Sequence, residues 1–417
     1  MADNNENKVL NVPHLRFPEF SEEWEICKVS ELLDFYSTNS LSWEQLEYGT
    51  KAMMNLHYGL IHVGLPTMVD LTRDNLPNIK EDNMPKNFEL CKEGDVAFAD
   101  ASEDTNEVAK PIEFFDLAGK NIVCGLHTIH GRDNKNKTVI GFKGYAFSSS
   151  AFHNQIRRIA QGTKIYSIST KNFSECFIGI PSKVEQTKIA TLLRLIDERI
   201  ATQNKIIEDL KKLKSAISKY LFARKDLLET TICLSNIATL KNGYAFQSGK
   251  YNALGKWKIL TITNVPGERY INDEDCNCII NLPNDIQDHQ VLKEGDILIS
   301  LTGNVGRVSL CKNGNYLLNQ RVGLLQLAKN VNQEFLYQIL SSQRFENSMI
   351  ACGQGAAQMN IGKGDVENYV LPYSSNGNNI LFAAKILHSY DECIINELRR
   401  LTLLTMQKQY LLTQMFI

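Results

Sequence analysis

Two turns in the second half of the chain carry polar side chains suited to reading hydrogen-bonding groups on a ligand. An Arg side chain can form paired hydrogen bonds with guanine, and Asn or Gln with adenine, in the major groove of DNA. The alternative for each residue is a turn side chain that caps its own backbone, and both interpretations stay open. The residues lie in LTGNVGRV and LLNQRV and are Thr302, Asn304, Arg307, Asn319, Gln320 and Arg321.

The first half of the chain carries different chemistry at the comparable place. Ser102 and Thr105 follow the run FADA, and His127 and Arg132 lie in GLHTIHGRD. Two more residues are predicted to contact DNA, Lys164 and Gln358. Each lies in the segment that precedes one of the two long helical segments described below. The turns of the two halves therefore differ, as two readers of different half-sites would.

Motifs of a self-contained enzyme are missing from the sequence. No Gly-Lys pair is followed by Ser or Thr, which excludes a phosphate loop of the Walker type. GQGAAQ at 353–358 begins like a dinucleotide fingerprint but has Gln358 in place of the third glycine. Two prolines are never adjacent, which excludes the Asp/Asn-Pro-Pro-aromatic tetrapeptide of amino-group DNA methyltransferases. We predict a non-catalytic chain that binds no cofactor itself.

Metal-binding patterns are equally weak. The ten cysteines are scattered, and the only close pair is Cys276 and Cys278, whereas zinc sites usually need two such pairs at matched spacing. His127 and His130 could be ligands, but no two histidines have the spacing of a helical metal site. We predict ordinary reduced thiols and no metal. A metal-dependent hydrolase built on these residues is a third, poorer hypothesis.

The elements that must position the turn residues occur twice. KEGD at 92–95 recurs at 293–296, and each copy precedes a strand-like run, VAFA or ILIS. LIDERI at 195–200 matches SYDECI at 389–394, and the offset of 194 holds without a gap along both helical segments. Several matches in the same order indicate two tandem copies of one unit.

Each copy ends in a segment with an apolar heptad pattern, typical of a coiled-coil seam. Polar residues interrupt both seams at equivalent places, Lys214 in one and Lys408 in the other. About 34 residues would make each helix roughly 50 Å long. We expect the helices to pair in antiparallel fashion, although each could instead pack on its own domain. The predicted seam residues are Ile189, Leu193, Ile196, Ile200, Ile207, Leu210, Ile217, Leu387, Ile394, Leu401, Leu404 and Leu411.

The predicted fold class is α+β, with two tandem β-rich α+β domains and two long helices that pair as an antiparallel coiled coil in a pseudo-two-fold internal repeat. The short strand-like runs between turns, such as ILTITNV at 259–265, support β-rich domains. The predicted boundaries are 1–185 for the first domain, 186–225 for the central helix, 226–376 for the second domain and 377–417 for the C-terminal helix.

Composition sets broad limits. The 417 residues are 43% hydrophobic and 22% charged, with a net charge of −2, which neither favours nor excludes a nucleic-acid partner. A basic run at 211–225 is our choice for contact with DNA phosphates, through Lys211, Lys212 and Lys214, although a solvated helix face is the plainer alternative. No apolar stretch predicts a signal peptide or a membrane span, so we expect a cytoplasmic protein.

Three segments give the chain a resemblance to a known family. They are VPHLRFPEFSEEWEICKVSEL near the start, LKEGDILISLTGNVGRV with LLNQRVGLL, and IPSKVEQTKIATLLRLIDERI before the basic helix. They resemble the specificity subunit of Type I restriction-modification systems over nearly the whole chain. The best matching residues are Pro181, Glu185, Gln186, Ile189, Leu193, Asp197 and Ile200.

The resemblance implies two target recognition domains that read the two parts of a split, asymmetric sequence in double-stranded DNA. It implies paired helices that set the spacer and dock two methylation subunits, which use S-adenosylmethionine, and two restriction subunits, which use ATP and Mg²⁺. The second copy departs from the family pattern, with YSSNGNNILFAAKIL where the first has PSKVEQTKIATLL. The alternative function is a coiled-coil scaffold without a nucleic-acid partner.

Overall fold

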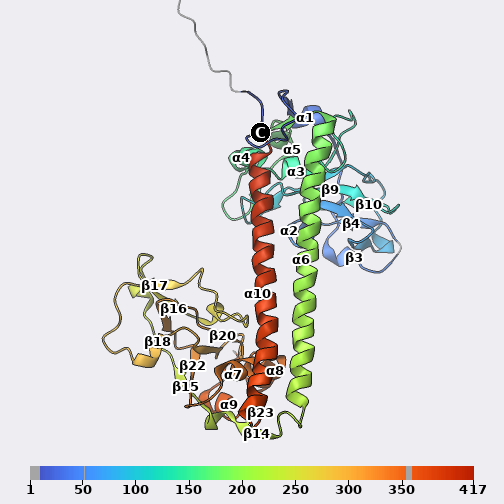
Figure 1. Cartoon of the computed structure of the whole chain (residues 1–417). Helices are drawn as coiled ribbons and strands as arrows, with labels where there is room; N and C mark the ends of the chain where they lie inside the picture. Colours follow the sequence, from blue (N-terminus) through green and yellow to red (C-terminus); the bar gives the residue numbers. More distant parts are fainter. Residues whose placement is uncertain (1–9, 51, 354–358) are drawn as a thin grey trace, which may run out of the picture. The chain divides into compact units, whose positions relative to one another are not determined.

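The structure is a computed structural model that describes residues 10–50, 52–353 and 359–417 (Figure 1). The chain forms two compact units. Unit 1 comprises Met1–Asn204 with Arg400–Ile417, and unit 2 comprises Lys205–Arg399. Each unit therefore contains half of each long helix, whereas the sequence analysis placed the helices in segments of their own.

Unit 1 is built on two larger sheets and two strand pairs. The five-stranded sheet has the order β2 (Asp34–Tyr36), β11 (Thr128–Arg132), β7 (Val96–Ala99), β9 (Pro111–Asp116) and β5 (Met68–Asp70). The four-stranded sheet has the order β10 (Ile122–Cys124), β4 (Met54–Leu56), β6 (Asn78–Ile79) and β3 (Leu46–Glu47). The pairs are β1 (Glu25–Lys28) with β13 (Phe177–Ile180), and β8 (Ala101–Ser102) with β12 (Tyr166–Ser167).

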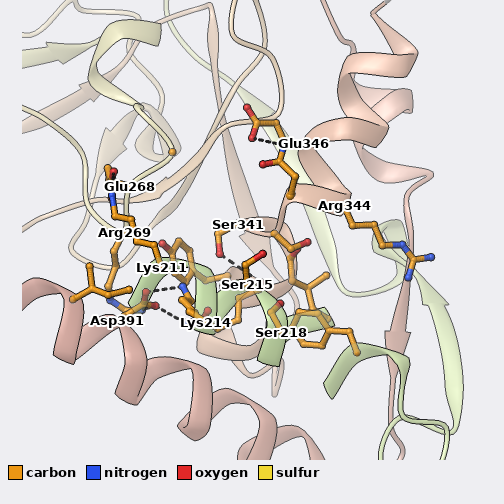
Figure 2. A pocket seen from close by; sticks show the side chains of 18 of the residues that line it. Lys211, Lys214, Ser215, Ser218, Glu268, Arg269, Ser341, Arg344, Glu346 and Asp391 are labelled. Atoms are coloured by element: carbon orange, nitrogen blue, oxygen red, sulfur yellow. Dashed lines mark hydrogen bonds and ion pairs between the residues drawn. The ribbon is translucent and has the colours of Figure 1, made fainter. Parts of the chain in front are cut away.

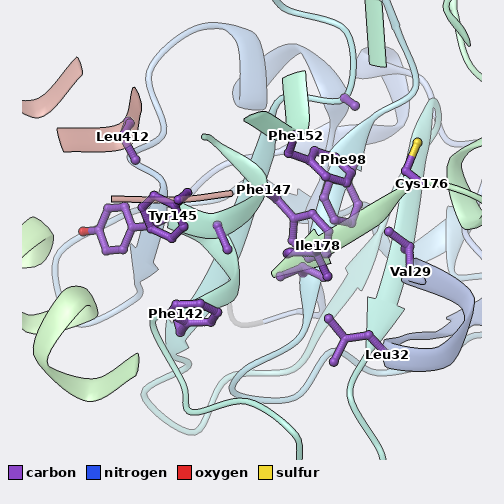
Figure 3. Packing of buried hydrophobic residues seen from close by; sticks show 14 of the residues in the cluster. Val29, Leu32, Phe98, Phe142, Tyr145, Phe147, Phe152, Cys176, Ile178 and Leu412 are labelled. Atoms are coloured by element: carbon purple, nitrogen blue, oxygen red, sulfur yellow. The ribbon is translucent and has the colours of Figure 1, made fainter. Parts of the chain in front are cut away.

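Short helices cover the core of unit 1. Phe98 of β7 packs against Phe173 with ring centroids 4.6 Å apart. Phe147 packs against Phe152 with ring centroids 4.8 Å apart (Figure 3). Burying each such ring stabilises the unit by roughly 1.5–3 kcal/mol. The helices are α1 (Val29–Leu32), α2 (Tyr58–His62), α3 (Lys143–Phe147), α4 (Ser150–Ile159) and α5 (Thr170–Ser174).

Unit 2 repeats this plan, with fewer strands among its described residues. One sheet has the order β15 (Ala238–Asn242), β22 (Val322–Leu327), β19 (Ile297–Ser300) and β20 (Val308–Leu310). The other has the order β17 (Asn277–Ile279), β16 (Trp257–Leu260), β21 (Tyr316–Leu318) and β18 (Val291–Leu292). β14 (Thr230–Cys233) pairs with β23 (Val370–Tyr373), and the short helices are α7 (Gln333–Leu340), α8 (Gln343–Cys352) and α9 (Lys363–Glu367).

The predicted repeat is visible in the backbone. In each KEGD turn the aspartate, Asp95 or Asp296, accepts a hydrogen bond from the lysine N–H at the start of the turn, at 2.9 and 2.8 Å. The glycine of each turn has a positive φ, 83° and 86°, which glycine adopts without strain. The same local chemistry therefore starts β7 and β19.

Helix caps repeat as well. Ser149 accepts a hydrogen bond from the backbone N–H of Phe152 at the start of α4, and Ser342 accepts one from Phe345 at the start of α8. Each cap satisfies one of the free N–H groups of the first turn. Both phenylalanines are buried, so each cap also fixes where its helix enters the core.

The two long helices are α6 (Lys183–Ala223) and α10 (Gly377–Gln414), and they pack together (Figure 1). All twelve predicted seam residues are buried or half-buried. In unit 1, Lys408 of α10 pairs with Asp197 of α6 at 2.6 Å, and in unit 2, Lys214 of α6 pairs with Asp391 of α10 at 2.6 Å. The lysines that interrupt the seams thus make equivalent ion pairs, and their order shows that the helices run in opposite directions.

The first turn of α6 has a structural role. Glu185 is 1% exposed and forms two hydrogen bonds with Arg16, at 2.7 and 2.8 Å. Gln186 is fully buried, accepts a hydrogen bond from Val139 N–H and donates to the carbonyl of Pro181. These side chains fix the start of α6 in unit 1. The departure of the second copy from this pattern therefore changes how its helix is anchored.

In the described part of the chain, no long helix is apolar enough to cross a membrane.

Candidate nucleic-acid interface

The polar turns of unit 2 lie next to each other. We call residues 301–307 and 318–322 the second tip. The turns are joined where the N–H of Leu301 donates to the carbonyl of Arg321 at 3.0 Å. The side chains of Asn304, Gln320 and Arg321 are exposed, and within the described residues none of the three side chains has a hydrogen bond or ion pair. They are therefore available to a ligand.

Unit 1 has the equivalent arrangement, residues 100–106 and 124–128, which we call the first tip. Here the N–H of Asp100 donates to the carbonyl of His127 at 3.1 Å, which corresponds to the contact in the second tip. His127 is exposed and has a φ of 55°. Its Nδ1 atom lies 3.2 Å from Oδ1 of Asp100. Burial raises the pKa of Asp100, although His127 lowers it.

The two tips differ in charge. Glu103 and Asp104 are exposed in the first tip, whereas Arg307 and Arg321 are the charged residues of the second. Carboxylates can accept hydrogen bonds from the amino group of cytosine, whereas arginine donates to guanine. The scaffold thus presents different hydrogen-bonding groups at the same place, as the sequence comparison predicted.

Two residues of the turns that were predicted to contact DNA are buried. Arg132 is 7% exposed, and its guanidinium donates to Asp95, Glu89 and the carbonyl of Leu90. Those bonds raise the pKa of Arg132 in spite of its burial. Asn319 is 9% exposed, and its Oδ1 accepts the N–H of Arg321, so it caps its own turn. Both predictions as DNA contacts are wrong because these side chains are buried and bonded inside unit 1 and unit 2, respectively.

The other predicted tip residues differ in their burial and hydrogen bonding. Ser102 accepts a hydrogen bond from Asp104 N–H, and Thr302 has a buried hydroxyl without a partner among the described residues. Thr105 is half-buried. Arg307 is half-exposed and lies 3.4 Å from Glu346. Of the predicted residues in the two tips, four have exposed side chains: Asn304, Gln320, Arg321 and His127.

The remaining loop predictions concern the segments before the long helices. Lys164 is exposed in a loop next to β12, which pairs with β8 of the first tip, so it lies on the same side of unit 1. Gly162 in this loop has a φ of 141°, and a Cβ there would lie 1.9 Å from the carbonyl oxygen of Ile165. Gln358 lies outside the described residues.

A stack of aromatic rings that no sequence motif indicated lies beside the first tip. The rings of Trp43 and His57 lie 4.4 Å apart, and Tyr58 lies 4.7 Å from His57 and 5.2 Å from His127. His62 completes the link, because its Nε2 lies 2.9 Å from the carbonyl of Ala101. Burial lowers the pKa of His57, and His127 lowers it further. The residues come from segments that are far apart in sequence, and no motif could have joined them.

The basic run on α6 is largely paired with acidic residues. Lys211 pairs with Glu268 at 2.9 Å, and Lys212 pairs with Glu208 on the same helix. Lys214 is 19% exposed and binds Asp391 (Figure 2). Lys214 was predicted as a phosphate contact, and this is wrong, because its ammonium group is held between the two helices. Lys211 and Lys212 stay accessible.

Lys211 and Lys214 line a cavity in unit 2 with a volume of about 880 Å³. Figure 2 shows Arg269, Lys214 and Asp391 converging at one side of it. Arg269 Nη1 lies 2.9 Å from Asp391, and its guanidinium also donates to Glu334 at 2.9 and 2.6 Å. Burial lowers the pKa of Arg269, but its acidic partners outweigh that and raise it. The cavity wall is a charge network that joins α6, α7 and α10.

Known proteins share both the sequence and the fold. The model of the Type I restriction modification DNA specificity domain matches residues 229–405. The putative type I restriction enzyme MjaX specificity subunit of Methanocaldococcus jannaschii is 22% identical over 382 residues, covering 88% of this chain and 86% of that protein. Residues 229–405 thus match a Type I restriction modification DNA specificity domain, and the chain is similar to a specificity subunit over most of its length. Specificity subunits are the non-catalytic members of these systems, in agreement with the missing enzyme motifs.

Further relatives agree with this assignment. The Type I restriction enzyme MjaVIII specificity subunit of the same organism is 29% identical over 213 residues, and the match spans about half of each protein, 45% of this chain and 49% of the other. The crystal structure of a Type I restriction-modification S subunit from M. genitalium superimposes with a TM-score of 0.56 at 18% identity, over 97% of this chain and 99% of that one. A chain from a type I R-M system has a TM-score of 0.57 at 15% identity, over 96% and 98%. These two structures share the fold of two β-rich domains joined by paired helices, as the sequence predicted.

Proposed function

We propose that this specificity subunit reads a split target in double-stranded DNA, one part through each tip. The observation that carries the proposal is a backbone hydrogen bond that joins the two turns of each tip, from Asp100 to His127 and from Leu301 to Arg321. The exposed side chains of these joined turns differ between the two tips. A repeated scaffold with unlike contact groups suits an asymmetric target. A scaffold without a nucleic-acid partner would not need such differences.

In the second tip, Gln320 and Arg321 are the side chains proposed to contact base edges, with Asn304 beside them. Their exposure and lack of partners in the described chain support this role. In the first tip, His127 and Thr105 take the same part, and Lys164 would contact a phosphate. The exposed ring of Trp43 is suited to pack on the DNA surface near the first tip.

The proposed complex follows the family resemblance. The subunit would work in the cytoplasm with two methylation subunits and two restriction subunits. S-adenosylmethionine, ATP and Mg²⁺ would bind to those subunits, because no nucleotide-binding motif is present in this sequence. Lys211 and Lys212 of α6 would add phosphate contacts, which supply much of the affinity of DNA-binding proteins.

The test is an Arg321→Ala variant assembled with its methylation subunits. Loss of a paired hydrogen bond to guanine costs about 1–3 kcal/mol, so binding to the target should weaken roughly 5- to 150-fold, with little change on non-specific DNA. Lys329→Ala is the matched control: it removes the same charge from an exposed residue at the opposite end of β22. Equal effects of the two variants on both DNAs would refute the assignment of the second tip.

A His127→Ala variant tests the first tip in the same assay. If each tip reads its own part of the target, base changes in one half of the target should be tolerated better by one variant only. Sequencing of methylated sites in a host that expresses each variant would show which half is affected. Relaxation of the same half by both variants would contradict the division of labour.

A further inference from the structure

Three side chains that lie apart in the sequence meet inside unit 1. Cys91 and Cys124 have their sulfur atoms 3.6 Å apart, and a ring nitrogen of His130 lies within 4.8 Å of both. All three residues are buried, at 5%, 1% and 0% exposure. Cys91 precedes the KEGD turn, Cys124 ends β10 and His130 lies in β11, so the group bridges the two sheets of unit 1.

We propose that Cys91, Cys124 and His130 form a binding site for a thiophilic metal ion, with Zn²⁺ as the ion of best fit. Two thiolates and one imidazole are a common part of zinc sites. Zinc at about 2.3 Å from each sulfur in tetrahedral geometry would place the sulfurs about 3.8 Å apart, close to the distance that the fold sets. Three protein ligands leave one position for a water molecule.

The hydrogen bonding of His130 leaves one ring nitrogen available to a metal ion. Nε2 of His130 lies 2.7 Å from Oδ2 of Asp95, whereas Nδ1 is buried without a hydrogen-bond partner among the described residues. A carboxylate that accepts the N–H of one ring nitrogen leaves the lone pair of the other nitrogen for a metal. A buried polar atom without a partner is costly, and a metal at Nδ1 would remove that cost.

The charges around the site balance when the ion is bound. Zn²⁺ is neutralised by two thiolates, and Asp95 is neutralised by Arg132, which donates to both of its carboxylate oxygens at 2.9 and 2.8 Å. Binding would release the two thiol protons to the solvent. A buried site can hold a divalent ion only with such compensation.

The second copy of the repeat serves as an internal comparison. His130 pairs with the second residue of β7, and Leu324 pairs with the second residue of β19. Cys124 and Leu318 end the equivalent strands, and Leu292 precedes KEGD as Cys91 does. The three leucines belong to one apolar cluster. The scaffold is therefore complete with three apolar residues at these positions, so its packing does not require two thiols and an imidazole.

The turn of the first tip connects two of the ligands, since residues 125–129 run from Cys124 to His130. A bound ion would therefore hold both ends of this turn. The inference itself does not depend on the proposed function, because metal content and DNA binding are measured separately.

The experiment measures metal in the purified full-length chain. After removal of metal with a chelator, the chain is titrated with Zn²⁺ and, in parallel, with Co²⁺, whose thiolate charge-transfer and d–d absorption bands report sulfur ligands and tetrahedral geometry. We expect about one equivalent of metal per chain and both sets of bands. Cys91→Ser and Cys124→Ser should each reduce binding at least tenfold. Cys176→Ser, which alters a buried cysteine elsewhere in unit 1, is the matched control and should bind normally.

The wild-type titration keeps the test decisive even if a variant fails to fold. Binding of less than about a tenth of an equivalent by the wild-type chain would overturn the inference. So would unchanged binding by folded Cys91→Ser. A Cys91–Cys124 disulfide, detected as a cross-linked peptide in the chain isolated without reductant, together with absence of metal binding after reduction, would also overturn it and identify the pair as a redox-active dithiol.

Discussion

The two aspartates at equivalent positions of the repeat should differ in their contribution to stability. Asp391 has a side chain that is 7% exposed and accepts hydrogen bonds from Lys214 at 2.6 Å, Arg269 at 2.9 Å and Gln338 at 2.6 Å. An Asp391→Ala change would leave Lys214 and Arg269 without this partner, although Arg269 keeps Glu334. Removal of one member of a buried ion pair costs about 3–5 kcal/mol, and we expect unit 2 to lose an amount in this range.

Asp197 is the counterpart in unit 1 and is less buried, with 21% exposure. It accepts a hydrogen bond from the hydroxyl of Tyr145 at 2.9 Å and forms an ion pair with Lys408 at 2.6 Å. Lys408 is also 21% exposed, so water can solvate its ammonium group when Asp197 is removed. The loss of this ion pair therefore costs less stability than the loss of the buried pair in unit 2. The main loss is the hydrogen bond of the buried Tyr145, and an Asp197→Ala change should cost about 1–3 kcal/mol.

Hydrogen exchange of the native chain, read by mass spectrometry, measures these losses separately for the two units. The slowest amides of unit 2 should exchange faster in Asp391→Ala, by about two to four orders of magnitude, because each 1.4 kcal/mol is a factor of ten. Asp391→Asn is the control, since it keeps an acceptor oxygen and the side-chain shape, and it should cost less. The double variant Asp391→Ala with Lys214→Ala should be more stable than the sum of the single losses predicts, because no unpaired lysine is left.

An Asp391→Ala change that costs no more stability than Asp197→Ala would refute the expected difference. Faster exchange in unit 1 instead of unit 2 would refute it as well. Either result would mean that the ion pair of unit 2 is solvated in spite of its burial.

Single contacts of Gly162, the lysines of α6 and Asp273 have consequences that can be measured. Gly162→Ala should destabilise unit 1 by at least about 2 kcal/mol, because its φ is positive and the new Cβ would meet a backbone oxygen at 1.9 Å; thermal unfolding measures this. Lys211→Ala and Lys212→Ala should each reduce the salt dependence of DNA binding by about one unit of slope without changing stability, whereas Lys214→Ala should lower stability instead. Hydrogen bonds from two lysines and a tyrosine hold the pKa of Asp273 well below its usual value, so its contribution is complete above about pH 3.9 and is lost as the pH falls further. An Asp273→Asn variant should therefore be less stable than wild type at pH 7, and the difference should shrink in acid denaturation curves below pH 4.

Local patterns were enough to predict the repeat and the seam. Heptad spacing depends on residues three or four positions apart, and the KEGD turn forms its hydrogen bond within four residues. These features do not depend on distant partners, so the sequence alone could indicate two β-rich domains and two paired helices. The order of the matches along the chain then indicated the tandem repeat.

The exposure of individual polar side chains could not be predicted in this way. Arg132 and Arg321 both follow short strand signals, yet Arg132 is buried against Asp95, 37 residues away, and Arg321 is exposed. Lys214 was part of a basic run in the sequence, but its partner is 177 residues away on the other helix. Whether a charged group faces solvent or a buried partner depends on strand and helix pairing, which residue types do not encode locally.

The sequence by itself thus determined the periodicities, the doubled plan and the family, because these depend on short-range spacing and on order along the chain. Only the tertiary structure decided which side chains meet. Cys91 and Cys124 are 33 residues apart and looked like ordinary thiols, and the pairing of the sheets brings their sulfurs to 3.6 Å beside His130. The physical reason is that such contacts arise when separate strands pack on one core, so their partners are set by the fold and not by neighbouring residues.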